Sequence, residues 1–354
     1  MDHYRLLGRS GLRVSPLSLG AMTFGDAWGW GADKKDSKRI FDAYLDAGGN
    51  MVDTANIYTD GQSERYLGEF LRGRRDSVVV ATKYAATRDP SDPNAGGAGR
   101  KSLRGSVDAS LKNLGTDYID LLYLHAWDGV TPSDEVIASL GELVRSGKVL
   151  YLGISDTPAW QVARMQTVAD VRGRPSFAAL QVEYSLIERT TERELLPMAA
   201  ELGLGVIPWA PLGGGVLTGK YTAADLVTSG SDSPAGTRRD HAQANGTLTP
   251  RGLAIADTVV DVARELGVTP AQVALAWTLH KPTVVSSLIG ARTLEQLQQN
   301  IAALEVEFEE SQLETLHAAS AVDLGFPHEF LMRPMVRGVT TGRTSVRPRP
   351  DRTW

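Results

Sequence analysis

The sequence contains no cysteine among its 354 residues. This absence excludes disulfide bonds, thiolate metal sites and a cysteine nucleophile, and it fits a reducing compartment. The formal net charge is only −5, which gives no indication of a nucleic-acid partner. The first ten residues contain no apolar signal region, and no hydrophobic run approaches the length of a membrane span. We therefore expect a cytoplasmic protein that binds neither nucleic acid nor membrane.

Hydrophobic residues make up 42% of the chain and charged residues 22%, a balance typical of a globular protein rather than a disordered one. A chain of this length could form two average domains, but no Pro-, Gly- or Ser-rich linker divides it. We expect residues 1–354 to form a single domain.

Short apolar runs alternate with amphipathic helical runs along the chain. The run 77–82 is the clearest strand, because it is continuous and rich in valine, as a buried parallel strand should be. Strands are predicted at 17–20, 50–53, 77–82, 119–124, 149–154, 179–182, 204–208 and 284–289. Helices are predicted at 35–47, 63–71, 100–113, 133–145, 158–169, 192–201, 251–266, 270–280 and 293–303. Eight βα units without a break predict an α/β fold, the (β/α)8 TIM barrel.

Four segments do not fit this repeat. Residues 8–14 indicate an N-terminal β-hairpin that could close the barrel floor. Residues 87–99 and 221–250 are polar and are predicted to be loops. Beyond the barrel we expect an additional C-terminal helix or tail. Its last part, 333–354, contains six arginines and one acid and has no helical period, so we expect it to be irregular.

Polar side chains follow three successive predicted strands. Asp53, Lys83 and His125 come directly after apolar runs, and Tyr58 lies five residues beyond Asp53. Active sites of (β/α)8 barrels lie at this end of the strands. A lysine beside a tyrosine is expected to lower the phenol pKa, and Asp53 would hold that lysine charged. Each residue alone is often only a helix cap or a structural group, but the four together favour an acid catalyst for carbonyl reduction.

These residues resemble the aldo-keto reductase family. The segment Asp53-Thr54-Ala55-Asn56-Ile57-Tyr58 is similar to its D-T-A-x-x-Y motif, Val80-Ala81-Thr82-Lys83 to the strand with the catalytic lysine, and Leu121-Leu122-Tyr123-Leu124-His125 to the strand with the catalytic histidine. The similarity runs from about Tyr4 to about Ala319. It implies reduction of an aldehyde or ketone by hydride transfer from NADPH, with Asp53, Tyr58, Lys83 and His125 as the catalytic tetrad and Tyr58 as the general acid.

The resemblance also implies the cofactor site. Asp156 stands where the family has an asparagine, and a carboxylate can accept a hydrogen bond from an amide but cannot donate one. Arg292 is the residue left to bind a 2′-phosphate, which favours NADPH over NADH. No G-x-G-x-x-G motif opens a βαβ unit, so a Rossmann domain is not indicated. The residues implied to bind cofactor are Met22, Thr23, Ser155, Asp156, Gln181, Trp209, Ala210, Pro211, Leu212, Gly213, Gly215, Leu217, Gly219, Lys220, Gly290, Arg292, Gln296, Gln299 and Asn300.

Aromatic residues after the first, third and fourth strands are candidates for the substrate wall, since such walls suit apolar carbonyl compounds. These candidates are Phe24, Trp28, Trp30, Tyr84 and Trp127. Trp28 and Trp30 could equally be loop anchors. The arginine-rich tail either crosses the barrel mouth and selects an anionic substrate or has no fixed structure.

Two alternative functions for these residues are a regulatory subunit and a metal-dependent hydrolase. A redox-sensing regulatory subunit, resembling potassium-channel β subunits, would bind the cofactor but turn over slowly. A metal-dependent hydrolase would need a cluster of histidine and carboxylate ligands, and none can be read among the six histidines. We therefore expect no metal. We expect a small-molecule carbonyl substrate and a monomer or weak homo-oligomer.

Overall fold

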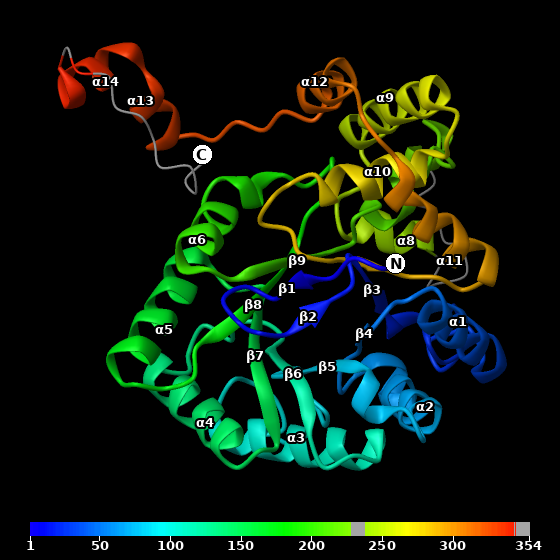
Figure 1. The fold of residues 1–354 in the computed structure, drawn as a ribbon, viewed down its shortest axis with the longest axis vertical. Coiled ribbons are helices and arrows are strands. Elements are labelled where there is room, and N and C mark those ends of the chain that lie inside the picture. The colour runs from blue at the N-terminus through cyan, green and yellow to red at the C-terminus, as the bar shows by residue number, and fades with distance from the viewer. Residues whose placement is uncertain (228–237, 343, 345–354) are drawn as a thin grey trace.

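Eight parallel strands form a nearly closed ring in the computed structural model, which describes residues 1–227, 238–342 and 344 (Figure 1). The first and last strands of the sheet order are β10 and β9. The gap between them is closed by backbone hydrogen bonds, from Val206 N to Thr283 O (2.9 Å) and from Val285 N to Val206 O (3.0 Å). The strands are β3 (Leu17–Gly20), β4 (Met51–Asp53), β5 (Val79–Tyr84), β6 (Ile119–Leu124), β7 (Val149–Ser155), β8 (Phe177–Glu183), β9 (Gly205–Trp209) and β10 (Ser287–Ile289). The predicted (β/α)8 barrel is confirmed.

Helices cover the outside of the ring, and their predicted positions agree within a few residues. Thr249 and Thr269 cap the starts of α9 and α10, and each is followed by a proline in the first helical turn, where its missing N–H costs nothing. Within the described residues, no helix is both long and apolar enough to cross a bilayer. The barrel helices are α1 (Lys34–Asp46), α2 (Gln62–Phe70), α3 (Arg100–Leu114), α4 (Ser133–Arg145), α5 (Ala159–Val171), α6 (Leu195–Leu202), α9 (Pro250–Leu266), α10 (Pro270–Leu279) and α11 (Leu294–Ile301), followed by α12 (Glu310–Ala319).

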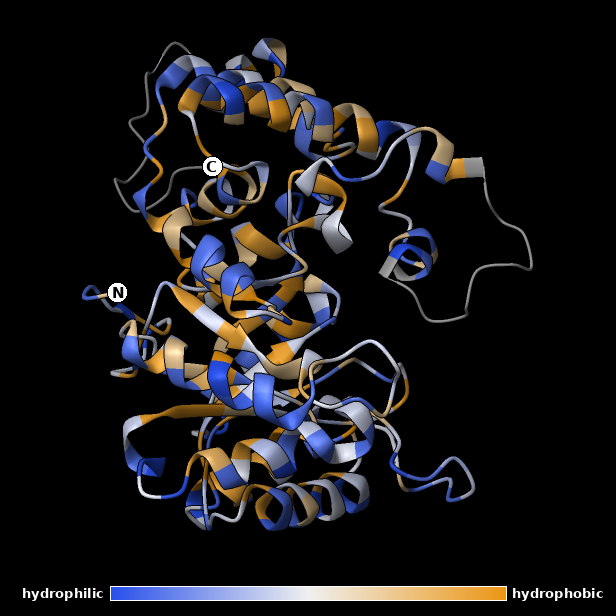
Figure 2. Cartoon of the chain, turned by 90° about the vertical axis from the view of Figure 1, so that its right-hand side faces the viewer, coloured by the Kyte–Doolittle hydropathy of each residue, from blue (hydrophilic) through white to orange (hydrophobic). Residues whose placement is uncertain are grey.

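The strands are buried on both faces, which explains their continuous apolar sequences. Every residue of β5 and β6 is buried. Inside the ring, Met51, Ala81, Leu121 and Ile207 pack together, while a second layer fills the space between strands and helices. Figure 2 shows the mainly hydrophobic strands at the centre and mixed helix faces outside.

The predicted N-terminal hairpin is confirmed and lies across one end of the ring (Figure 1). β1 (Arg5–Leu6) pairs antiparallel with β2 (Arg13–Val14), and Leu7 and Val14 are fully buried against the barrel interior. Gly8 has φ +57°, and a Cβ there would lie 2.4 Å from the Ala178 carbonyl oxygen. Only glycine fits this approach without strain, so the hairpin is a close-packed plug for the barrel floor.

Two predicted segments of the barrel region differ in the structure. Only 287–289 of the predicted strand 284–289 is strand, because the preceding residues make the bridge to β9. The predicted loop 221–250 contains two short helices, α7 (Ala224–Val227) and α8 (Arg238–Ala244), whose few turns are too short to give a periodic signal. Residues 228–237 lie outside the described part.

The predicted irregular tail 333–354 is wrong at its start, where α14 (Pro334–Thr341) follows α13 (His328–Met332). Pro334 begins α14 with its fixed φ, and the apolar Met335, Val336 and Val339 cover only two turns, so the sequence shows no repeat. Figure 1 shows both helices projecting from the barrel after α12. Residues 343 and 345–354 lie outside the described part.

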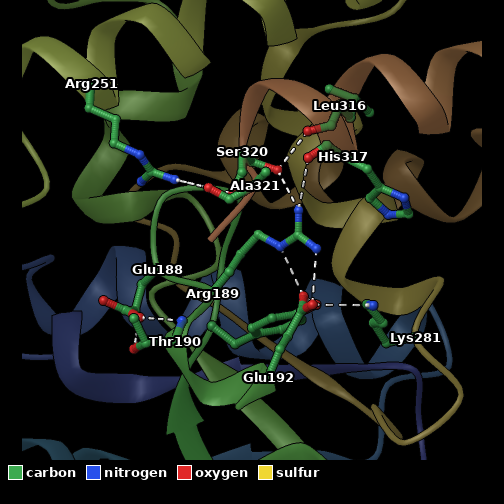
Figure 3. A network of polar contacts seen from close by, with 11 residues as sticks. Glu188, Arg189, Thr190, Glu192, Arg251, Lys281, Leu316, His317, Ser320 and Ala321 are labelled. Carbon is green, nitrogen blue, oxygen red and sulfur yellow. Dashed lines mark hydrogen bonds and ion pairs between the residues drawn. The ribbon is translucent and has the colours of Figure 1, made fainter. Parts of the chain in front are cut away.

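A buried ionic network holds the end of α12 against the barrel (Figure 3). Arg189, in the loop after β8, makes two hydrogen bonds of 2.9 Å to the Glu192 carboxylate and donates to Ser320 Oγ (2.8 Å) and His317 O (3.2 Å). Arg251 donates to Ala321 O (3.0 Å). These contacts satisfy a guanidinium that would otherwise be costly to bury, and they fix the chain up to residue 321.

Candidate active site

The four predicted catalytic residues come together at the end of the barrel opposite the hairpin. Asp53 ends β4, Lys83 is the second-last residue of β5, and His125 follows β6. Tyr58 begins a short 3-10 helix (Tyr58–Gly61) after β4. Lys83 Nζ donates to Asp53 Oδ1 and to Thr54 O (2.9 Å). It lies 4.9 Å from the Tyr58 ring centroid, and the Tyr58 and His125 ring centroids are 5.9 Å apart.

The Lys83 ammonium is buried yet charged. Its side chain is 1% exposed, and burial alone would lower its pKa, but the Asp53 carboxylate and, less strongly, the neighbouring Tyr58 raise the pKa above the ordinary lysine value. An opposite charge in contact outweighs the loss of solvent here. The site therefore holds a fixed positive charge beside the phenol.

The pKa of Tyr58 moves in the direction opposite to our prediction. Burial raises it above the ordinary tyrosine value, and Lys83 lowers it only in part. The prediction of a lowered pKa considered the cation but not the loss of solvent, which is the larger effect. Tyr58 is therefore protonated at neutral pH, so it carries the proton that an acid catalyst must give.

His125 is neutral at physiological pH. Burial and, to a smaller extent, the nearby Lys83 charge lower its pKa to about 3. Its Nδ1 is buried and has no hydrogen-bond partner among the described residues. A neutral imidazole can donate from one nitrogen and accept at the other, so His125 can bind a polar atom without adding a charge.

Unsatisfied polar atoms and strained backbone gather at this end of the barrel. Besides His125 Nδ1, buried atoms at this end without a partner in the described part include Asn56 Oδ1, Tyr123 Oη and Ser155 Oγ. All five non-glycine residues with positive φ in the described part lie in loops that follow barrel strands, namely Thr59, Asp60, Ala85, Asp156 and Ala210. Such features cluster where a protein binds or reacts.

Gln181 contacts the catalytic centre directly. It is buried on β8, and its Nε2 donates to Asp53 Oδ2 (2.9 Å). Asp53 is thus held by Lys83 through one oxygen and by Gln181 through the other. This bond uses a donor that the resemblance assigns to the cofactor, so Gln181 also orients Asp53.

Asp156 and Trp209 form a pair at the ends of β7 and β9. The Trp209 indole Nε1 donates to Asp156 Oδ1 (3.0 Å). Loss of solvent raises the pKa of Asp156, while the indole N–H and Lys83 oppose that shift. Between them, Glu183 ends β8. Burial, then the nearby charges of Glu188 and Asp156, raise its pKa to about 7.

The glycine run after β9 forms a tight 3-10 turn (Gly213–Thr218). Gly213, Gly214 and Gly215 have φ of +55°, +65° and +95°, and a Cβ on Gly215 would lie 3.0 Å from Lys220 Nζ. Successive turns of this kind suit anions. The predicted neighbours Ala210, Pro211 and Leu212 lead into this turn, and exposed Gly219 follows it, whereas Leu217 is buried in the core.

The predicted adenosine-end residues lie after β10. The Gly290 carbonyl accepts from Asn300 Nδ2 (3.2 Å), and the Arg292 backbone N–H donates to Gln296 Oε1 (2.9 Å). Gln299 is exposed, and Thr23, next to Met22, donates to the Ala291 carbonyl (3.0 Å). The Arg292 side chain is exposed, and its guanidinium makes no hydrogen bond or ion pair within the described residues.

The predicted substrate residues divide into two groups. Trp28 packs edge-on against Tyr58 (6.3 Å between centroids) and lies beside Trp30, and Trp127 packs against Trp160. Phe24 and Tyr84 instead are 0% exposed and belong to the core. Their prediction as wall residues is not supported, because both rings are buried in the apolar layer between the strands and the helices.

The comparison with known proteins agrees with this geometry. The model of the aldo/keto reductase family matches residues 16–321. The chain belongs to the aldo-keto reductase family. It is 40% identical to a norsolorinic acid reductase of Emericella nidulans, covering 94% of this chain and 85% of that protein. It is 39% identical to an aryl-alcohol dehydrogenase of Pestalotiopsis microspora (96% and 88%) and 36% identical to a putative aryl-alcohol dehydrogenase of Saccharomyces cerevisiae (94% and 90%).

This aldo-keto reductase is therefore an oxidoreductase that interconverts small carbonyl compounds and alcohols, in a family that generally uses NAD(P)H. Sequence reasoning missed one residue at this end of the barrel, Glu183. Glu183 ends a strand as Asp53 does, so the strand-end rule would have found it.

Proposed function

We propose that the protein reduces an aldehyde or ketone with NADPH and that Tyr58 donates the proton. The observation that carries this proposal is the buried Lys83 ammonium, ion-paired to Asp53 and 4.9 Å from the Tyr58 ring centroid. When Tyr58 gives up its proton, the phenolate that remains lies beside this fixed cation. Stabilising charge where it develops is the largest catalytic effect available to such a site.

The residues present fit a nicotinamide dinucleotide. The unpartnered Ser155 Oγ, together with Asp156 and Gln181, would hold the carboxamide. The glycine turn with Lys220 beside Gly215 would hold the pyrophosphate, because a side chain at Gly215 would fill that space. When bound, the cofactor supplies the hydride for the carbonyl carbon. The chain supplies orientation, the proton from Tyr58 Oη, and a neutral His125 that can hydrogen-bond the carbonyl oxygen.

Preference for NADPH is supported by Arg292. Its guanidinium is exposed at the start of α11 with no protein anion engaged among the described residues. A planar guanidinium is well suited to a phosphate monoester. We expect Arg292→Ala to weaken NADPH binding about tenfold and to leave NADH binding unchanged, as measured side by side by fluorescence titration. Equal weakening of both nucleotides would contradict this role.

An aromatic substrate is supported by two independent points. Trp28 and Trp30 pack together beside Tyr58, so the proton donor is next to aromatic surface. Relatives of similar length are named aryl-alcohol dehydrogenases. We therefore expect aryl aldehydes to be reduced with higher kcat/KM than aliphatic aldehydes of equal size.

The test combines turnover and binding. Purified protein is mixed with NADPH and a panel of aryl and aliphatic aldehydes, and the loss of NADPH absorbance is followed. Tyr58→Phe removes only the hydroxyl group, so turnover should fall about 10³-fold while NADPH still binds. Turnover that survives in Tyr58→Phe would overturn the proposed acid. Tight binding without turnover in the native protein would favour the regulatory-subunit alternative.

A further inference from the structure

The Asp156–Trp209 pair has a fixed geometry at the mouth of the barrel. The indole N–H donates to Asp156 Oδ1 (3.0 Å). Asp156 has φ +39°, and Ala210, which follows Trp209, has φ +49°. Neither residue is glycine, so the surrounding structure must hold both conformations against their strain. Asp156 is solvent-exposed, and its hydrogen bond with the Trp209 indole fixes the direction in which its carboxylate points.

Negative charge is concentrated around this pair. A cavity of about 310 Å³ is lined by Asp156, Glu183, Glu188 and Trp209, and no basic residue is among its described lining residues. Glu188 is held by its hydrogen bond to Thr190 N (2.7 Å), as Figure 3 shows. Two buried cations of this end of the barrel are already paired with carboxylates, Lys83 with Asp53 and Arg189 with Glu192. The potential at this side of the mouth is therefore negative.

A second observation indicates that a ligand belongs here. Ser155, the residue before Asp156, is 1% exposed, and its Oγ has no hydrogen-bond partner of ordinary geometry in the described part, although it is near enough to Asp156 to lower the pKa of that carboxyl group. A buried hydroxyl without a partner costs free energy unless something binds it. Ser155 and Asp156 thus present an unused polar group and a fixed carboxylate at the same strand end.

We propose that Asp156, held by Trp209 and supported by Glu183 and Glu188, makes this site bind the oxidised, positively charged nicotinamide in preference to the reduced, neutral one. This inference rests on the proposed function, because it requires nicotinamide to bind at this strand end. The physical reason is that a fixed carboxylate attracts a cationic ring and gains nothing comparable from a neutral ring. The asparagine that the family resemblance leads one to expect would lack this charge.

The experiment compares the dissociation constants of NADP+ and NADPH for the full-length protein and its Asp156→Asn variant. Asparagine keeps the acceptor oxygen for the Trp209 indole and removes only the charge. Intrinsic fluorescence titrations at pH 8 measure both constants. We expect the ratio Kd(NADPH)/Kd(NADP+) to fall about tenfold in the variant, chiefly through weaker NADP+ binding.

Two controls separate charge from structure. Glu183→Gln removes a charge behind the pair and should lower the same ratio by a smaller factor, about threefold. Asp261→Asn removes a charge on the outer helix α9, where Asp261 pairs with Arg264, and should leave the ratio unchanged. Thermal unfolding of each variant checks that the fold is retained.

The possible outcomes are distinct. An unchanged ratio in Asp156→Asn, whether or not both nucleotides bind more weakly, would overturn the charge-selection proposal and leave the proposed function standing. If the native protein bound neither nucleotide, the proposed function would fail and this inference with it. A lowered ratio in Asp156→Asn with no change in Asp261→Asn would support the proposal.

Discussion

The two ends of the barrel are formed by the same strands but differ in whether their buried polar groups have hydrogen-bond partners. At the floor, the hairpin buries Leu7 and Val14, and the Asn50 side chain bonds Ser15 N (2.8 Å) and Arg13 O (2.9 Å). At the mouth, the buried ion pair of Lys83 and Asp53 lies at the same end as polar atoms for which the described residues supply no hydrogen-bond partner. At the floor, the hairpin covers the barrel and the Asn50 side chain is hydrogen-bonded. At the mouth, charged and unpartnered polar groups lie near strained backbone.

This difference indicates that the mouth of the barrel lowers the stability of the folded state. Strained backbone and unsatisfied polar atoms each destabilise the folded state. They persist at the mouth because the rest of the barrel, including the packed floor, holds them in place. Substitutions at the mouth should therefore change activity and pH dependence, and substitutions at the floor should change stability.

The largest effect is expected at Lys83. Lys83→Met should reduce kcat/KM by more than about 10³-fold, because the charge that stabilises the phenolate is lost. It should also destabilise the protein by about 4 kcal/mol, because Asp53 is left as an unpaired buried charge. Steady-state kinetics and denaturant unfolding measure the two effects.

The double variant Lys83→Met with Asp53→Asn serves as the control. Removing both charges should restore most of the lost stability and none of the activity. Recovery of activity in the double variant would contradict the role given to the ammonium.

The next largest effect is expected at the floor of the barrel, on the stability of the fold. Gly8→Val should destabilise the fold by about 3 kcal/mol, since Gly8 has φ +57° and any Cβ would meet the Ala178 oxygen at 2.4 Å. Activity per folded molecule should be unchanged. Gly173→Val is the matched control, because Gly173 has the same φ of +57° with open space around its Cβ position. Equal losses at both positions would mean that backbone strain alone, and not the close approach of the plug, sets the cost.

A smaller, pH-dependent effect is expected at Glu183, whose pKa is raised to about 7. The folded state then holds the proton more tightly than the unfolded state, so this group contributes no penalty at pH 4 and destabilises the fold as the pH rises through 7. Glu183→Gln should therefore be about 2 kcal/mol more stable than the native protein at pH 8, and equal to it at pH 4. Thermal unfolding at both pH values is the measurement, and a gain of the same size at pH 4 would exclude titration as the cause.

The smallest effect is expected from the C-terminal helices. α13 and α14 have no buried residue, so a chain ending at Leu324 should unfold within about 0.5 kcal/mol of the full chain. A much larger loss would show that these helices support the barrel.

Most of the fold could be predicted from the sequence because strands and helices leave local periodic signals. The eight strands, the hairpin and the four polar residues at the mouth follow from runs of a few residues and from the strand-end rule. α14 and the two helices in 221–250 could not be predicted, since one or two turns are shorter than a period can reveal.

By itself, the sequence determined which residues occupy the strand ends and hence which chemistry the barrel mouth can hold. Only the tertiary structure decided how these groups behave. Burial raises the pKa of Tyr58 although the Lys83 charge lowers it in part. The Gln181 amide donates a hydrogen bond to Asp53, and the Trp209 indole donates one to Asp156. Phe24 and Tyr84 pack into the core. The physical reason is that solvation and pairing depend on neighbours distant in the chain, and no local pattern records how much water those neighbours exclude.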